Sequence, residues 1–136
     1  MIYLTRVEHF NAAHKLYNPE WSVEKNFEVF SKCSNPNWHG HNYELHVTVK
    51  GEPNPETGFV YNAKELSQII KDVVLEKIDH RNLNLDVDFM EGKFTSAENL
   101  AIGIWDQLKP HIEKDGVQLH CIKLLETRNI YVEYYG

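Results

Sequence analysis

Polar and apolar residues alternate along the middle of the chain, from His41 to Gly51. Successive side chains of a β-strand point to opposite faces, so this alternation predicts a strand with one apolar and one polar face. The first face carries His41, Tyr43, Leu45, Val47 and Val49. Residues Ile2–His14 mix β-branched, aromatic and polar types, which indicates an earlier strand that ends near His14.

Two further strands are predicted at the C-terminus, where Val117–Thr127 and Ile130–Tyr135 flank a turn at Arg128-Asn129. Proline, asparagine and glycine within Pro53–Gly58 indicate a turn after the central strand. We expect this turn to lead into a short partner strand over Phe59–Tyr61.

Two long helices are predicted between the strands. The first begins at Asn62, with Glu65 in the capping-box position, and the second begins at Thr95, with Glu98 in that position. The second helix should end near Pro110. Both segments carry apolar residues at helical spacing: Leu66, Ile69, Ile70, Val73 and Val74 in the first, and Ala97, Leu100, Ala101, Ile104 and Leu108 in the second.

A shorter helix is predicted after the first strand, with Asn18 as its N-cap and Pro19 as its first residue. Its apolar face would consist of Trp21, Phe27 and Phe30. A loop over Cys33–Asn37 then leads to the central strand. Strands, then interleaved helices, then strands again predict an α+β fold with a mostly antiparallel sheet and both long helices on one face.

Length and composition narrow the class of protein. A chain of 136 residues fits one domain, so we expect residues 1–136 to form a single unit. No apolar run is long enough to cross a bilayer, the N-terminus lacks the features of a secretion signal, and neither cysteine belongs to a Cys-x-x-Cys pair. We therefore expect a cytoplasmic protein with two reduced thiols and no membrane partner.

The formal net charge of −6 argues against a nucleic-acid partner, because such partners are normally bound by a basic stripe. A small anionic ligand needs only a local basic patch. Candidates for such a patch are Lys25, Lys32, Arg81 and Lys93.

Three histidines are the strongest chemical signal. His39 and His41 stand two positions apart at the start of the central strand, so both side chains can turn toward one metal ion. A third imidazole from His14 would give a three-histidine zinc site with one open position, which is typical of catalytic zinc. Taken alone, a histidine at a strand end is more often a hydrogen-bonded structural residue than a ligand.

A thiol and three other side chains are candidates for further chemistry. Cys33 lies in a polar loop shortly before the histidine pair, where it could act as a base or have no role. Asp79 can fix the tautomer of His80, although the plainer interpretation is a histidine that complements a helix dipole. Glu126 is predicted to point inward, where it would pair with a planar ligand or with Arg128.

Five motifs, in their order along the chain, resemble the 6-pyruvoyl-tetrahydropterin synthase family, which includes the 6-carboxy-tetrahydropterin synthases of the queuosine route. The motifs are Phe10–His14, Cys33–Tyr43, Asp79–Asn84, Ser96–Asn99 and Glu126-Thr127. The resemblance implies the tunnelling fold (T-fold), a four-stranded antiparallel sheet with two helices on one face. It also implies a homo-hexamer, a dimer of trimers, with each active site at a subunit boundary.

The same resemblance assigns roles to three groups of residues. The Zn²⁺ ligands would be His14, His39 and His41. The catalytic residues would be Cys33, as the base that abstracts a proton, and Asp79 with His80, as the rest of a proton relay. The residues that bind the pterin would be Glu126, Thr95, Ser96 and Glu98.

The implied activity is that of a zinc-dependent lyase that eliminates triphosphate from 7,8-dihydroneopterin triphosphate. The product would be 6-pyruvoyl-tetrahydropterin, for tetrahydrobiopterin biosynthesis, or 6-carboxy-5,6,7,8-tetrahydropterin, for queuosine biosynthesis. The five-residue gap between Cys33 and His39 resembles the pyruvoyl-forming branch, whereas Ala97 stands where many relatives carry a hydroxyl residue. Two alternatives are zinc-dependent hydrolysis of a pterin phosphate and a non-catalytic pterin-binding module.

Overall fold

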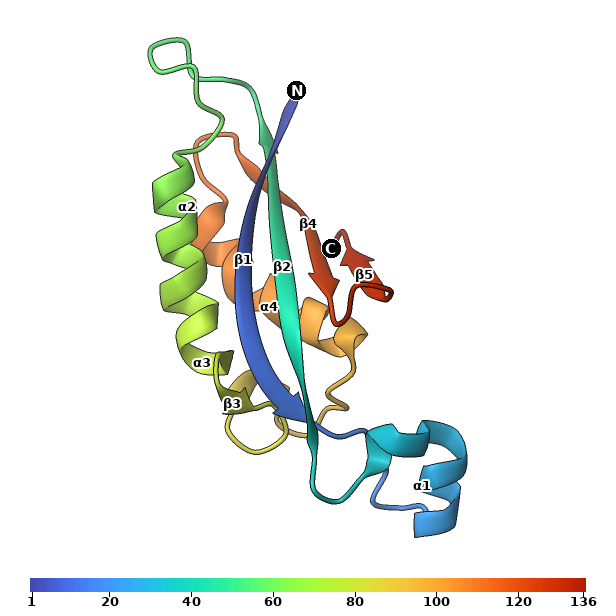
Figure 1. Ribbon diagram of the computed structural model, residues 1–136. Coiled ribbons are helices and arrows are strands. Elements are labelled where there is room, and N and C mark those ends of the chain that lie inside the picture. Colours follow the sequence, from blue (N-terminus) through green and yellow to red (C-terminus); the bar gives the residue numbers. More distant parts are fainter.

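The computed structural model describes all 136 residues and has at its centre a five-stranded sheet in the order β3-β1-β2-β4-β5 (Figure 1). The strands are β1 (Ile2–His14), β2 (His39–Gly51), β3 (Arg81–Asn82), β4 (Gln118–Leu125) and β5 (Tyr131–Tyr134). All neighbours pair antiparallel except β3, which pairs parallel with the end of β1. The predicted α+β fold with four antiparallel strands is confirmed, and the two-residue strand β3 adds to it.

Strands β1 and β2 pair along their whole lengths, from Ile2 opposite Gly51 to His14 opposite His39. Because this register is unbroken, the apolar residues of both strands face the same side of the sheet. The buried apolar members of this face are Phe10, Ala12, Tyr43, Leu45, Val47 and Val49. The same register sets His14 beside His39 at the end of the hairpin.

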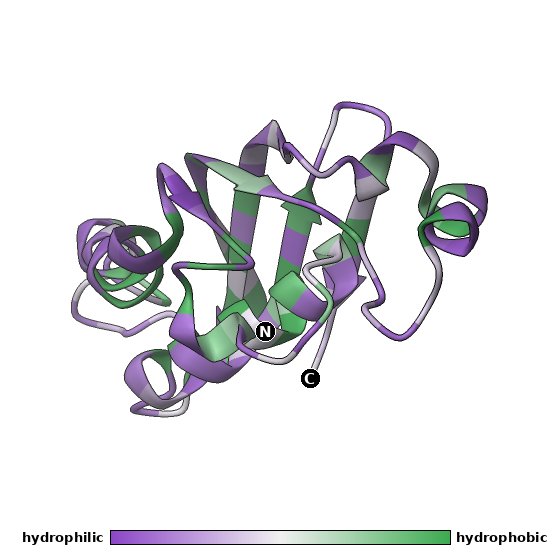
Figure 2. Ribbon diagram, turned by 90° about the horizontal axis from the view of Figure 1, so that it is seen from below, coloured by the Kyte–Doolittle hydropathy of each residue, from purple (hydrophilic) through white to green (hydrophobic).

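Helices cover the apolar face of the sheet. The first helical segment runs from α2 (Ala63–Ile70) through a π-helical turn (Lys71–Leu75) into α3 (Glu76–Ile78), and α4 spans Ala97–Ile112 (Figure 1). Apolar side chains of these helices, the sheet and the segments that connect them form one core of 24 buried residues. Figure 2 shows the apolar and polar residues alternating along the strands, as a sheet with one covered face requires. The prediction that both long helices share one face is confirmed.

The predicted cap of α2 and the predicted end of α4 near Pro110 agree with the structure, whereas the predicted start of α4 differs by one residue. Asn62 caps α2 as predicted, because its side chain accepts hydrogen bonds from two backbone N–H groups of the first turn. Helix α4 is capped by Ser96, whose hydroxyl accepts the N–H of Asn99, so the predicted cap at Thr95 was one residue early. The helix also continues two residues past Pro110, because a proline in the last turn removes a single hydrogen bond.

Two short elements were predicted wrongly. Residues 59–61 form no strand, and the buried ring of Tyr61 packs into the core instead. Helix α1 (Val23–Phe30) begins after a Ser22 cap rather than at Pro19. This helix lies between β1 and β2 in the sequence and projects from the body of the molecule (Figure 1). A 3₁₀ turn over Ser31–Ser34 follows it.

No helix of the structure combines the length and apolarity needed to cross a membrane. Cys33 and Cys121 are both free thiols, as expected from their spacing.

Glu8 is a buried carboxylate between β1 and α2. It accepts hydrogen bonds from the Ser67 hydroxyl at 2.5 Å and from Arg6 Nε at 2.8 Å. Burial raises the pKa of Glu8, but the hydrogen bonds from Ser67 and Arg6 outweigh it and leave the pKa below its ordinary value. A carboxylate with a lowered folded-state pKa stabilises the fold above its unfolded pKa, and this contribution is lost as the pH falls through the folded value.

We therefore expect Glu8→Gln to lower the free energy of unfolding at pH 7 by about 1 kcal/mol. The deficit relative to wild type should shrink as the pH falls below the unfolded-state pKa of about 4.3 and on through the lower folded-state pKa. Urea unfolding at neutral and acid pH measures both values. A deficit that is the same at every pH would show that the charge of Glu8 does not contribute.

Candidate metal centre and active site

Three histidines meet at the end of the β1–β2 hairpin. His14 lies opposite His39, and His41 follows two residues along β2 on the same face. One ring nitrogen from each residue lies within 4.8 Å of the other two, and the ring centroids are 4.6 to 5.1 Å apart. The structure thus brings together all three predicted metal ligands.

The hydrogen bonding of these rings fits a metal ion. His14 Nδ1 lies 2.7 Å from the main-chain carbonyl of Thr95. Because a carbonyl only accepts, Nδ1 carries the hydrogen and Nε2 keeps its lone pair. His14 Nε2, both ring nitrogens of His39, and His41 Nε2 are buried without a protein partner. Buried polar atoms are costly to leave unpaired, and zinc is commonly held by three imidazoles.

Burial also favours the neutral form of the ligands. It lowers the pKa of His14 to about 4, against the opposing effect of the Thr95 hydrogen bond and with smaller contributions from His39 and His41. Burial, and then His41, lower the pKa of His39. A metal ligand must present a neutral imidazole, so His14 and His39 are suited to bind a metal at neutral pH.

The start of α4 supports this centre. Thr95 is 1% exposed, and its carbonyl orients His14 while its hydroxyl lies 3.0 Å from Asn84 Oδ1. Ser96 is half-buried at the N-cap, and Glu98 is exposed in the first turn. Thr95 and Ser96 thus form hydrogen bonds within the protein. That Thr95, Ser96 and Glu98 contact a pterin stays a prediction.

Glu126 lies just beyond β4, and its Oε1 is 3.6 Å from His41 Nε2. The sequence suggested Arg128 as a protein partner, but the side chain that Glu126 meets in the structure is that of His41, a candidate metal ligand. The carboxylate and the three histidines therefore belong to one site.

Tyr43 is a site neighbour that the sequence analysis placed in the core. Its ring is 1% exposed, stacks on Phe10 and meets the ring of His41 edge to face at 5.6 Å. Burial, and then the charge of Glu126, raise the pKa of Tyr43, so its hydroxyl stays protonated. Its two-residue spacing from His41 was the available signal, because side chains two apart share a strand face.

Cys33 lies in the 3₁₀ turn before β2, and its side chain is half-buried. Its main-chain carbonyl accepts a hydrogen bond from Leu16 N at 2.8 Å, which ties the turn to the segment that follows His14. Trp38, between this turn and His39, has a φ of 66°, which is rare for a bulky residue. Backbone strain of this kind is often found at functional sites.

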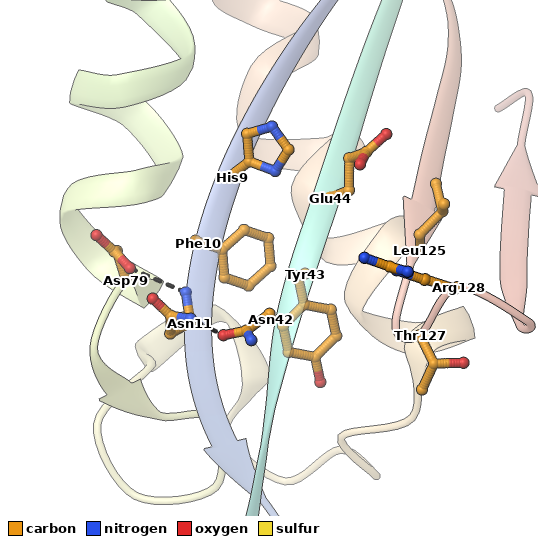
Figure 3. Close-up of a pocket in the computed structure, with 10 residues that line it drawn as sticks. All are labelled: His9, Phe10, Asn11, Asn42, Tyr43, Glu44, Asp79, Leu125, Thr127 and Arg128. Atoms are coloured by element: carbon orange, nitrogen blue, oxygen red, sulfur yellow. Dashed lines mark hydrogen bonds between the residues drawn. The ribbon is translucent and has the colours of Figure 1, made fainter.

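Asp79 and His80 form a hydrogen-bonded pair at the end of α3. Asp79 Oδ1 accepts from His80 Nδ1 at 2.9 Å and from the Asn11 N–H at 3.0 Å; Figure 3 shows the second bond. The pairing leaves His80 Nε2 free on a side chain that is 77% exposed. No hydrogen bond joins this pair to Cys33 within one chain.

Two neighbouring cavities adjoin these groups. The first, of about 400 Å³, has Asn11, Tyr43, Asp79 and Arg128 among its lining residues (Figure 3). The second, of about 550 Å³, is lined in part by His41, His80 and Arg81. Cavities of this size can hold a small molecule.

The fold and the site together define a class: a small α+β protein with three histidines that could hold a metal ion at the end of an antiparallel hairpin. The profile of the family described as 6-pyruvoyl tetrahydropterin synthase matches residues 3–136. The chain belongs to this family.

Individual relatives agree with the family match. The chain is 44% identical over 135 residues to 6-pyruvoyl tetrahydrobiopterin synthase of Dictyostelium discoideum, which covers 99% of this chain and 96% of the relative. It is 42% identical over 127 residues to the human protein of the same name, covering 93% and 86% of the two chains. The structure of Caenorhabditis elegans 6-pyruvoyl tetrahydropterin synthase superposes with a TM-score of 0.92 at 36% identity, covering 99% of this chain and 95% of that one. The predicted family and fold are confirmed.

Proposed function

We propose that this protein is a zinc-dependent lyase that eliminates triphosphate from 7,8-dihydroneopterin triphosphate and forms 6-pyruvoyl-tetrahydropterin. The observation that carries the proposal is the convergence of three imidazoles beside Glu126, each with a buried ring nitrogen that has no hydrogen-bond partner. Relatives that share 42% to 44% of its sequence bear the name of this activity, which supports the pyruvoyl product.

In this proposal His14, His39 and His41 hold Zn²⁺, which supplies Lewis-acid stabilisation of negative charge on the side-chain oxygens of the substrate. Glu126 accepts hydrogen bonds from adjacent N–H groups of the pterin, and its position beside His41 puts the pterin next to the metal centre. Thr95, Ser96 and Glu98, at the start of α4, complete the pterin site.

Cys33 acts as the base that abstracts a proton from the substrate side chain. Asp79 holds His80 in the tautomer whose Nε2 can exchange a proton with the substrate. General acid–base catalysis requires contact with the proton that moves, directly or through one water.

No hydrogen bond joins the Cys33 thiol to the His80 imidazole within one chain. In this proposal, assembly of several subunits brings the two groups into one site. Strand β3 pairs only with Ala12 and Ala13, so most of the β1 edge is open, as is the outer edge of β5. Pairing of such edges between subunits would remove the exposed backbone groups. These edges support assembly through sheet pairing, and the assembly we propose is the homo-hexamer that the family resemblance implies, a dimer of trimers with active sites at subunit boundaries.

Incubation of the zinc-loaded protein with 7,8-dihydroneopterin triphosphate tests the proposal. We expect release of inorganic triphosphate and a pterin product with the mass of 6-pyruvoyl-tetrahydropterin. Acetaldehyde together with 6-carboxy-tetrahydropterin would assign the protein to the carboxy-forming branch. Phosphate release without change in the pterin side-chain carbons would indicate a hydrolase, and binding without turnover would indicate a binding module.

A further inference from the structure

Lys15 has contacts that the proposed chemistry does not use. It follows His14 directly, and its ammonium lies 4.5 Å from the ring centre of Trp38 and 5.3 Å from that of Tyr17. Trp38 in turn directly precedes His39. Lys15 is therefore next to the candidate ligand His14 in the sequence, and its ammonium contacts the ring of Trp38, which is next to the candidate ligand His39.

The main chain of Lys15 is fixed as well. Asn84 accepts a hydrogen bond from Lys15 N and donates one to Lys15 O, both at 3.1 Å. The Thr95 hydroxyl lies 3.3 Å from Lys15 O, and the Thr95 carbonyl orients His14. Thr95 thus both holds the backbone of Lys15 and orients His14, so the backbone of Lys15 is fixed relative to a candidate metal ligand.

The ammonium of Lys15 carries an uncompensated charge. No carboxylate lies within 4.0 Å of it, whereas Lys109, Lys114 and Lys123 each have a glutamate partner. Aromatic rings orient an ammonium without neutralising it. Lys15 therefore keeps its charge available for an anion, in a protein whose net charge is −6.

We propose that Lys15 binds the triphosphate group of the substrate, an inference that rests on the proposed function. The triphosphate is carried by the same short side chain whose oxygens would bind at the three histidines, so the phosphates must lie close to that centre. Two of the basic residues that the sequence suggested are less suited: Lys25 lies on α1, which projects from the body (Figure 1), and Arg81 shares its cavity with the carboxylate of Asp86.

Binding measurements in the Cys33→Ala background, in which turnover should be slow, test the proposal. The probes are 7,8-dihydroneopterin triphosphate and the phosphate-free 7,8-dihydroneopterin. Lys15→Gln should weaken binding of the triphosphate by about 10-fold or more, because a hydrogen bond to a charged group is lost. It should leave unchanged both the affinity for dihydroneopterin and the zinc content, and Lys15→Arg should retain most of the affinity.

Lys109→Gln is the matched control. Its ammonium also lies near an indole ring, that of Trp105 at 5.6 Å, but it pairs with Glu113 at the far end of α4 from the metal centre. This variant should bind both probes as the parent does.

Equal weakening of both probes by Lys15→Gln would mean that Lys15 only supports the structure of the site, and unchanged binding of both would mean that another cation holds the phosphates. Either result overturns the assignment. If the unsubstituted protein binds the triphosphate through Lys15 yet releases no product, the proposed function fails while the assignment of Lys15 stands.

Discussion

Cys33→Ala should retain zinc and bind the pterin, while its turnover of 7,8-dihydroneopterin triphosphate should fall by about 10² to 10⁴. The substitution removes the proposed base but leaves the three histidines and Glu126 in place. The turn that carries Cys33 is held through its main-chain carbonyl, which accepts from Leu16, so the loss of the thiol does not remove that contact. Zinc content by elemental analysis and a steady-state assay measure the two properties separately.

Cys121→Ala is the matched control, because Cys121 is the other free thiol of the chain. It is 6% exposed on β4, and burial raises the pKa of its thiol, which disfavours the thiolate. This variant should keep wild-type turnover. Normal turnover in Cys33→Ala would exclude Cys33 as the base, and loss of zinc in that variant would show that the thiol is needed for metal binding.

The parts of the fold that follow from local periodicity were predictable. Strict alternation from His41 identified the central strand and its buried face, and the apolar stripe after Asn62 identified α2. The predicted start at Thr95 failed because Thr95 and Ser96 are both good capping residues. The structure uses Ser96 as the cap, since Thr95 is buried and bonded to Asn84.

The contacts that build the site could not be predicted from periodicity. His14 and Thr95 are 81 residues apart, and their hydrogen bond depends on how α4 packs against the hairpin. The approach of Glu126 to His41 depends on the register of β4 against β2. A pattern of two- or four-residue spacing carries no information on such pairs, which is why the family resemblance was needed to include His14.

Tyr43 and Lys15 show two different ways in which local patterns mislead. Tyr43 occupies an apolar position of an alternating strand, so its contact with the ring of His41 was hidden by its agreement with the core pattern. Lys15 lies beyond the end of the strand, where no periodicity applies. Its position is fixed by side chains from distant segments, Trp38 and Asn84.

His39→Ala should lose zinc, and its turnover should fall to the background rate. His14 and His41 would remain, but the imidazole of His39 would no longer complete the ligand set. Even loss of a residue that only orients a ligand typically costs about 10- to 100-fold in metal affinity, so loss of a ligand itself should cost at least that much. Elemental analysis after dialysis against a weak chelator measures the effect.

His46→Ala is the control for this variant, because His46 lies on the opposite face of the same strand and pairs with Glu44 at 2.5 Å. It should keep both zinc and turnover. A metal ion that binds only the folded state raises the free energy of unfolding. Added Zn²⁺ should therefore raise the Tm of the wild type and of His46→Ala. It should leave the Tm of His39→Ala nearly unchanged. Full zinc occupancy in His39→Ala, or an undiminished rise in its Tm, would place the metal elsewhere and remove the basis for assigning the three histidines to one centre.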